Sequence, residues 1–113
     1  MLPENNRLRG SLAFQKVKEE GKMHQSNTFG FLVRSRNDED PTRFGVVVST
    51  KISKKAVDRN KVKRMVKEAI RENLDKIKDG FDAVILAKKG LLEIDKKDLN
   101  KELEEALKKG KLV

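Results

Sequence analysis

The longest apolar pattern in the chain has the period of a helix, and shorter apolar runs with the period of strands stand on both sides of it. Between Asp58 and Gly80 the apolar side chains recur at helical spacing, at Val62, Val66, Ala69, Ile70, Leu74 and Ile77. Asp58 is the expected N-cap of this helix, and Gly80 is its expected end. Because an apolar stripe must be buried against another layer, the pattern predicts a helix that covers a sheet.

Three strands are expected, over residues 28–36, 43–51 and 81–89. Alternation in the first two places Phe29, Phe31, Val46 and Val48 on the core side. The third has a nearly continuous apolar centre, FDAVILA, which favours an interior position in the sheet. The shortest connection between the first two strands is a hairpin across the turn at 37–42.

Two further helices are expected near the ends of the chain. One covers residues 8–20, with Ser11 as its cap and Gly21 as its end. The other covers residues 95–109, where Leu99, Leu103, Ala106 and Leu107 form one stripe. The expected order is therefore α-β-β-α-β-α, in a single α+β sandwich domain over residues 1–113.

Charge is the second constraint, because 40% of the residues are charged and 36% are hydrophobic. Typical domains have about 25% charged residues, so the core must be small. The chain carries +9, and residues 51–71 hold nine Lys or Arg against two Asp or Glu. This concentration of positive charge in one segment predicts a nucleic-acid partner.

Like charges repeat every four residues along the predicted central helix, at Arg59, Lys63, Lys67 and Arg71. Such pairs weaken an isolated helix, and phosphate groups would relieve the repulsion. The candidate RNA contacts are Lys51, Lys54, Lys55, Arg59, Asn60, Lys63, Arg64, Lys67 and Arg71. The other interpretation of these residues is a solvated helix face.

The sequence offers no residues for catalysis or for a metal site in the protein itself. It has no Cys and one His, so a surface position is the simplest interpretation of His24. The acidic cluster Asp38, Glu39 and Asp40 precedes Pro41, which is typical of a solvated turn. No apolar run approaches the length of a membrane span, and no secretion signal is evident, so we expect a cytoplasmic protein.

The segment AVDRNKVKRMVKEAI, residues 56–70, resembles the signature of the bacterial ribonuclease P protein subunit. The matching residues are Ala56, Arg59, Asn60, Val62, Lys63 and Arg64. The surroundings also match, in FQKV at 14–17, FGVVVSTK at 44–51 and GFDAVILAKK at 80–89. The similarity covers nearly the whole chain, in order.

This resemblance implies a fold like the second domain of ribosomal protein S5, with a left-handed β-α-β crossover. It implies that the chain joins a catalytic RNA that cleaves precursor tRNA at the mature 5′ end, with Mg²⁺ held mainly by the RNA. The partners would be that RNA and the precursor tRNA, with neither a membrane nor DNA. The central helix and its preceding loop would contact the catalytic RNA.

The resemblance also implies that the 5′ leader lies between the first helix and the sheet, near Phe14, Lys18, Leu32, Arg34 and Ser49. Family members often have aromatic residues where this chain has Lys18 and Leu32, so charge is expected to contribute more to leader binding here. Phe14 is the candidate stacking platform, and packing of this ring in the core is the equal alternative.

Charge alone would equally allow a ribosomal or other structural RNA-binding protein. A protein nuclease is disfavoured because no carboxylate pair is placed to hold a metal. A helical DNA reader is disfavoured because no helix-turn-helix pair precedes the basic helix.

Overall fold

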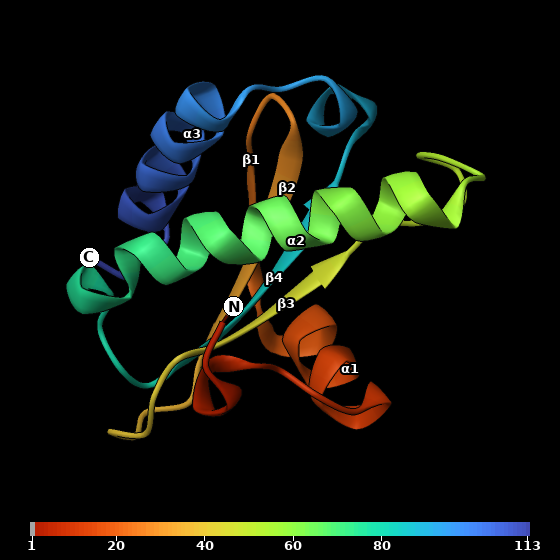
Figure 1. Cartoon of the computed structure of the whole chain (residues 1–113). Coiled ribbons are helices and arrows are strands. Elements are labelled where there is room, and N and C mark those ends of the chain that lie inside the picture. The colour runs from red at the N-terminus through yellow and green to blue at the C-terminus, as the bar shows by residue number, and fades with distance from the viewer. Residues whose placement is uncertain (1) are drawn as a thin grey trace.

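The computed structural model describes residues 2–113, which form a four-stranded sheet with helices on both faces (Figure 1). The helices are α1 (Ser11–Glu20), α2 (Ala56–Asn73) and α3 (Lys96–Lys109). The strands are β1 (Lys22–Gln25), β2 (Phe29–Ser35), β3 (Arg43–Val47) and β4 (Phe81–Ala87). Short 3-10 turns occupy Glu4–Asn6, Leu74–Lys76 and Lys89–Leu92. The predicted α+β class and order are confirmed, with one additional strand.

The sheet has the order β1-β2-β4-β3. β4 pairs with β2 in antiparallel and with β3 in parallel orientation, so its predicted interior position is confirmed. The predicted hairpin between β2 and β3 is wrong, because β4 lies between them. Since β4 is apolar on both faces, a central position buries more of its surface than an edge position would.

The β3–α2–β4 connection is a crossover between parallel strands. Viewed from the side of α2 with the strands pointing upward, β4 lies to the left of β3 (Figure 1). The crossover is therefore left-handed, which is rare among such units.

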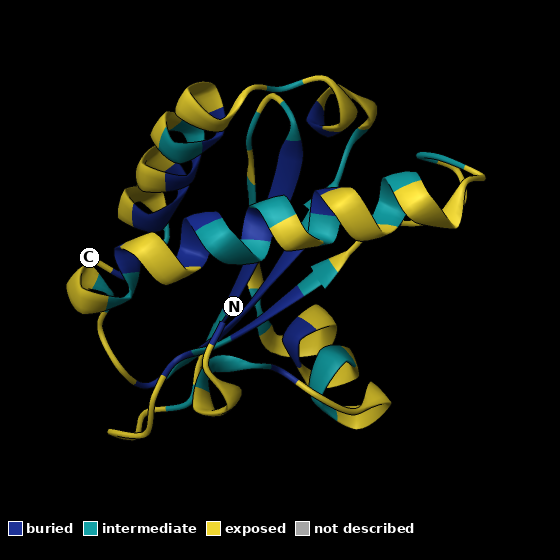
Figure 2. Cartoon of the chain, viewed as in Figure 1, coloured by how far each residue is buried: buried dark blue, intermediate teal, exposed yellow. Residues whose placement is uncertain are grey.

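The main core lies between the sheet and the pair α2 and α3. Phe29, Phe31 and Ile85 are fully buried there, together with the apolar stripes of both helices. Val48 is also buried and Val46 partly so, which confirms the predicted core side of the first two strands. Figure 2 shows the amphipathic character of α2, where buried and exposed residues alternate along the ribbon.

A smaller core lies on the other face of the sheet, under α1. It contains Leu8, Val17, Leu32 and Val84, with Phe14 packed against it. α1 therefore covers only part of this face, which is called the α1 face below.

Three helix boundaries differ from prediction. Ser11 is the first residue of α1 and makes no capping bond, because the cap is Gly10 with a positive φ of 89°. α2 begins before Asp58, and Ser53 Oγ accepts a bond from the Lys55 N–H at 3.2 Å at this end. α2 ends at Asn73 rather than continuing toward Gly80, and Asn73 Nδ2 donates to the Ala69 carbonyl at 2.8 Å.

The other predicted ends agree more closely. Gly21 ends α1, with its N–H donating to the Val17 carbonyl at 2.8 Å. Asp95 caps α3 by accepting from the Asp98 N–H at 2.8 Å. The strand β1 was not predicted, because its residues KMHQ show no apolar alternation.

Candidate nucleic-acid interface

The residues predicted to contact RNA, eight basic side chains and one asparagine, lie on α2 and on the loop before it. We call them the α2 surface: Lys51, Lys54, Lys55, Arg59, Asn60, Lys63, Arg64, Lys67 and Arg71. All nine are at least partly exposed, and the three lysines of the loop are exposed. The helix buries Val62, Val66, Ala69 and Ile70 on its other side, so the core fixes which charges point outward.

Arg59 connects the helix to the loop. Its guanidinium Nη1 donates to the Ser53 carbonyl at 2.9 Å, and Ser53 Oγ donates to Asp58 at 3.3 Å. These bonds hold the segment that carries Lys54 and Lys55 against the first turn of α2. Arg59 therefore positions the loop, and Asn60 and Arg64, which are exposed, remain directed to solvent.

Arg71 differs from the other members of the α2 surface because it pairs with Glu68 one turn earlier. The hydrogen bond from Arg71 is the largest of the causes that lower the pKa of Glu68 to about 2. The carboxylate is therefore charged at neutral pH and offsets part of the positive charge of Arg71.

A hollow of ≈ 420 Å³ lies between α2 and the N-terminal segment. Its lining residues are Leu2, Arg7, Asn60, Lys63, Arg64, Lys67 and Glu68. Arg7 Nε donates to the Leu2 carbonyl at 2.8 Å, and Leu2 is fully buried in the main core. Sequence reasoning missed Arg7, because no local pattern indicates that the N-terminal segment lies beside α2.

The five residues predicted to contact a leader do not form one compact site. Phe14 is half-buried over β3, Lys18 is exposed, and Leu32 is only 5% exposed in the α1 core. Arg34 lies in the same cross-strand row as Arg43, and Ser49 follows β3 by two residues. Ser49 is six residues of extended chain from Arg43, roughly 20 Å at about 3.3 Å per residue.

Phe14 lies directly on the sheet because β3 has a glycine beneath it. A Cβ placed on Gly45 would meet the Phe14 ring at 2.4 Å, which is closer than contact allows. One side of the ring is thus covered by β3. The ring is not completely buried, so part of it is accessible to solvent.

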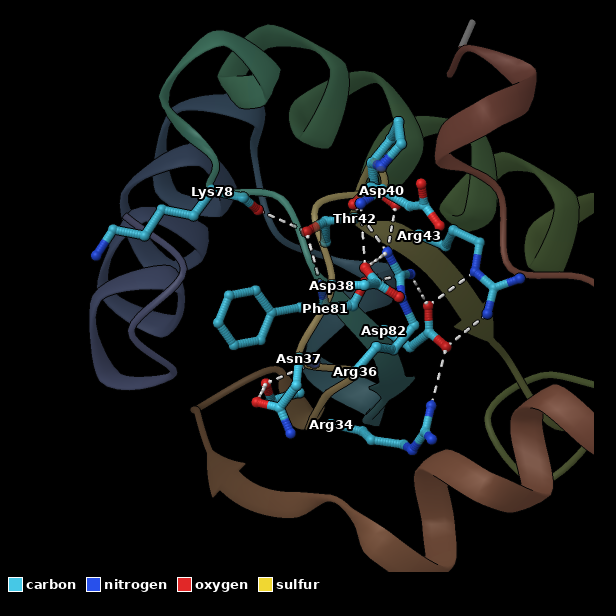
Figure 3. A network of polar contacts seen from close by, with 12 residues as sticks. Arg34, Arg36, Asn37, Asp38, Asp40, Thr42, Arg43, Lys78, Phe81 and Asp82 are labelled. Carbon is cyan, nitrogen blue, oxygen red and sulfur yellow. Dashed lines mark hydrogen bonds and ion pairs between the residues drawn. The ribbon is translucent and has the colours of Figure 1, made fainter.

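Arg34 is held by two carboxylates at the end of the α1 face. Its Nη1 lies 3.7 Å from Asp82 Oδ2, and its Nε lies 3.5 Å from Glu20 Oε2 at the end of α1. Asp82 is buried, and it also accepts bonds from Arg36 at 2.6 Å and from Arg43 at 2.7 and 2.8 Å (Figure 3).

Burial alone would raise the pKa of the Asp82 carboxyl, but hydrogen bonds from Arg43 and Arg36 outweigh burial and place the pKa below its ordinary value. Arg36 also binds Asp38 and the carbonyls of Asp40 and Pro41, so it fixes the loop between β2 and β3. Sequence reasoning missed this cluster because the register of three strands brings it together.

The comparisons with known proteins agree with this architecture. The family model described as Ribonuclease P matches residues 2–111. The chain is 37% identical to the ribonuclease P protein component of Rippkaea orientalis, over 99% of this chain and 91% of that protein. It is 40% identical to that of Clostridium botulinum, over 95% of this chain and 96% of that protein.

Solved structures give the same result. The ribonuclease P protein from Thermotoga maritima superposes with a TM-score of 0.81 at 36% identity, covering 91% of this chain and 96% of that one. The ribonuclease P protein from Staphylococcus aureus superposes with a TM-score of 0.84 at 25% identity, covering 95% of this chain and 96% of that one. The chain therefore belongs to the ribonuclease P protein family, the protein subunits of the ribonucleoprotein endoribonuclease that processes the 5′ ends of precursor tRNA.

Proposed function

We propose that the α2 surface is where this subunit binds the catalytic RNA, and that the RNA performs the cleavage. The proposal rests on the two sides of α2. Apolar residues fix its inner side in the core, and nine side chains able to bind RNA occupy its outer side and the preceding loop. Arginine and lysine bind phosphate, and asparagine can reach a base edge or a 2′-hydroxyl.

Mg²⁺ would be held mainly by the RNA in this proposal. Among residues 2–113, no group of three His, Asp or Glu side chains is arranged to hold a metal ion. In this proposal the contribution of the protein is to bind and position RNA. We further propose that this takes place in the cytoplasm; no helix within the described residues is long and apolar enough to cross a membrane.

Assembly with the catalytic RNA tests the α2 surface. Asn60→Ala and Arg64→Ala each remove an exposed side chain that makes no bond within the protein among those described. Losing a hydrogen bond to a charged group costs about 1.5–3 kcal/mol, so the Kd for the RNA should rise tenfold to hundredfold. Lys108→Ala, on the exposed side of α3, is the matched control. Equal Kd values for the three variants would contradict the placement of the interface.

Cleavage of precursor tRNA tests the division of labour. The protein alone should leave precursor tRNA intact, and addition of the catalytic RNA with Mg²⁺ should restore cleavage at the mature 5′ end. Robust cleavage by RNA-free protein would refute the proposal. Co-purification with ribosomal RNAs, rather than with one RNA of a different size, would favour a structural RNA-binding role instead.

We also propose that the α1 face holds the 5′ leader of the precursor. Phe14 is partly exposed, Lys18 and Ser49 are exposed, and Leu32 and Arg34 support the surface from below or from its end. Stacking is worth about 1–3 kcal/mol per base, so Phe14→Leu should weaken precursor tRNA binding by that amount and leave mature tRNA binding unchanged. An unchanged ratio of the two affinities, with a lower Tm, would assign Phe14 to packing alone.

A further inference from the structure

A second basic hollow lies on the opposite side of the sheet from the α1 face, at the end of α3. Its volume is ≈ 450 Å³, and its lining residues are Glu20, Lys22, His24, Val33, Ser35, Phe81, Lys109, Gly110 and Lys111. We call it the α3 hollow. It shares no residue with the α2 surface and none with the proposed leader contacts.

The topology explains why this part of the sheet is open. Lys22 and His24 of β1 pair with Val33 and Phe31 of β2, both of which face the main core. The side chains of Lys22 and His24 therefore lie on the side of α2 and α3. α3 ends at Lys109, so this part of the sheet extends past the end of that helix.

The floor of the hollow is apolar and its rim is cationic. Val33 and Phe81 contribute apolar surface, and Phe81 is only partly buried. Figure 3 shows the Phe81 ring projecting toward α3, away from the Asp82 cluster. The one carboxylate in the lining, that of Glu20, already lies 3.5 Å from Arg34 Nε.

Lysines at the end of a helix often only offset the helix dipole. Here the last carbonyls of α3 already have partners: those of Ala106, Leu107 and Lys108 accept the N–H groups of Gly110, Leu112 and Lys111. Lys22 follows Gly21, the C-cap of α1, whose N–H donates to the Val17 carbonyl, and His24 lies two residues further along β1. The dipole thus accounts for at most part of this cluster.

The position of Lys111 is also fixed. Its φ is +62°, a region that glycine or asparagine adopts at lower cost, and Leu112 is completely buried next to it. The Lys78 N–H donates to the Leu112 carbonyl at 2.6 Å, which ties this turn to the chain before β4. The fold therefore fixes the backbone from which Lys111 projects.

An aromatic side chain beside cationic side chains is the arrangement that proteins use for single-stranded nucleic acid. We propose that the α3 hollow is a second RNA-binding site, which holds one nucleotide of single-stranded RNA. Lys22, Lys109 and Lys111 bind its phosphate, and the base contacts Phe81. The proposal goes beyond the α2 surface and the α1 face, and it stands independently of both.

The test follows binding residue by residue, because the α2 surface also attracts RNA. An oligoadenylate of about five nucleotides is titrated into the isotope-labelled full-length protein, and amide shifts are recorded by NMR. We expect the amides of Lys22, Gly110 and Lys111 to shift. In the variant Lys22→Gln/Lys111→Gln these shifts should weaken, and the log–log salt slope of the affinity obtained from the Gly110 amide should become shallower by up to about 0.7, the value for one phosphate of a single strand. The α2 shifts should persist.

The control variant is Lys97→Gln/Lys101→Gln, which removes two exposed charges elsewhere on α3 and should leave the Gly110 titration unchanged. Adenosine monophosphate should bind the hollow more tightly than ribose 5-phosphate, and Phe81→Leu should abolish this difference in a variant whose Tm confirms folding. An unmoved Gly110 amide would overturn the proposal. Equal shifts with inorganic phosphate or with an oligoglutamate peptide would overturn it too, because they would reveal a general anion surface.

Discussion

Gly45→Ala is expected to disturb the contact between α1 and the sheet. Gly45 lies in β3 on the α1 face, and a Cβ there would stand 2.4 Å from Phe14 Cζ and 2.5 Å from Phe14 Cε1. Ordinary contact between carbon atoms needs about 3.5 Å, so the ring must move by roughly 1 Å. The backbone of β3 is paired to β4 along its whole length and cannot yield easily.

Overpacking of this kind costs about 1–3 kcal/mol. At roughly 4 °C for each kcal/mol at this chain length, the Tm should fall by roughly 4–12 °C. The leader proposal adds a second consequence: displacement of Phe14 should reduce the preference for precursor over mature tRNA. Thermal unfolding by circular dichroism gives the first quantity, and affinities of the assembled ribonucleoprotein give the second.

Two further variants make the prediction specific. Gly30→Ala is the matched control, because it lies in β2 on the same face but meets the flexible end of Met23, with Sδ at 3.1 Å. Gly30→Ala should leave the free energy of unfolding unchanged or raise it by up to about 1 kcal/mol, because alanine lowers the conformational entropy of the unfolded chain. Adding Phe14→Leu to Gly45→Ala should restore stability, with a coupling of about 0.5–3 kcal/mol. Equal Tm values for the two glycine variants, or the absence of rescue, would refute the contact.

Two other predictions concern charge. Asp82→Asn leaves three arginines around a buried neutral group and should lower the free energy of unfolding by about 3–5 kcal/mol in urea titrations at neutral pH. The pKa of Asp82 lies below its ordinary value, so the carboxylate stabilises the folded state above about pH 4. This stabilisation is lost as the pH falls through the folded-state pKa, and the variant should lack this acid-dependent loss. The affinity for the catalytic RNA should fall steeply with salt concentration. If about six side chains of the α2 surface contact phosphates, the slope of log K against log salt concentration should lie near −4 to −5. A slope near zero would exclude that surface as the interface.

The sequence by itself determined the elements whose signal is local. The spacing of apolar residues located α2 and α3, and alternation located the core faces of β2 and β3. The charge map and the R-N-x-x-K-R pattern located the α2 surface and indicated the family. Each of these depends on residues close together in the chain, whose relative placement follows from the helix or strand period alone.

The tertiary structure decided what depends on pairing between distant segments. The insertion of β4 between β2 and β3 replaced the expected hairpin, and β1 formed by pairing with β2 although its own residues lack a strand pattern. The Asp82 cluster and the α3 hollow arise from the same registers, which align residues tens of positions apart. Strand periodicity fixes which face a side chain occupies, but the choice of partner depends on how much apolar surface the assembled sheet buries, a quantity that no single segment contains.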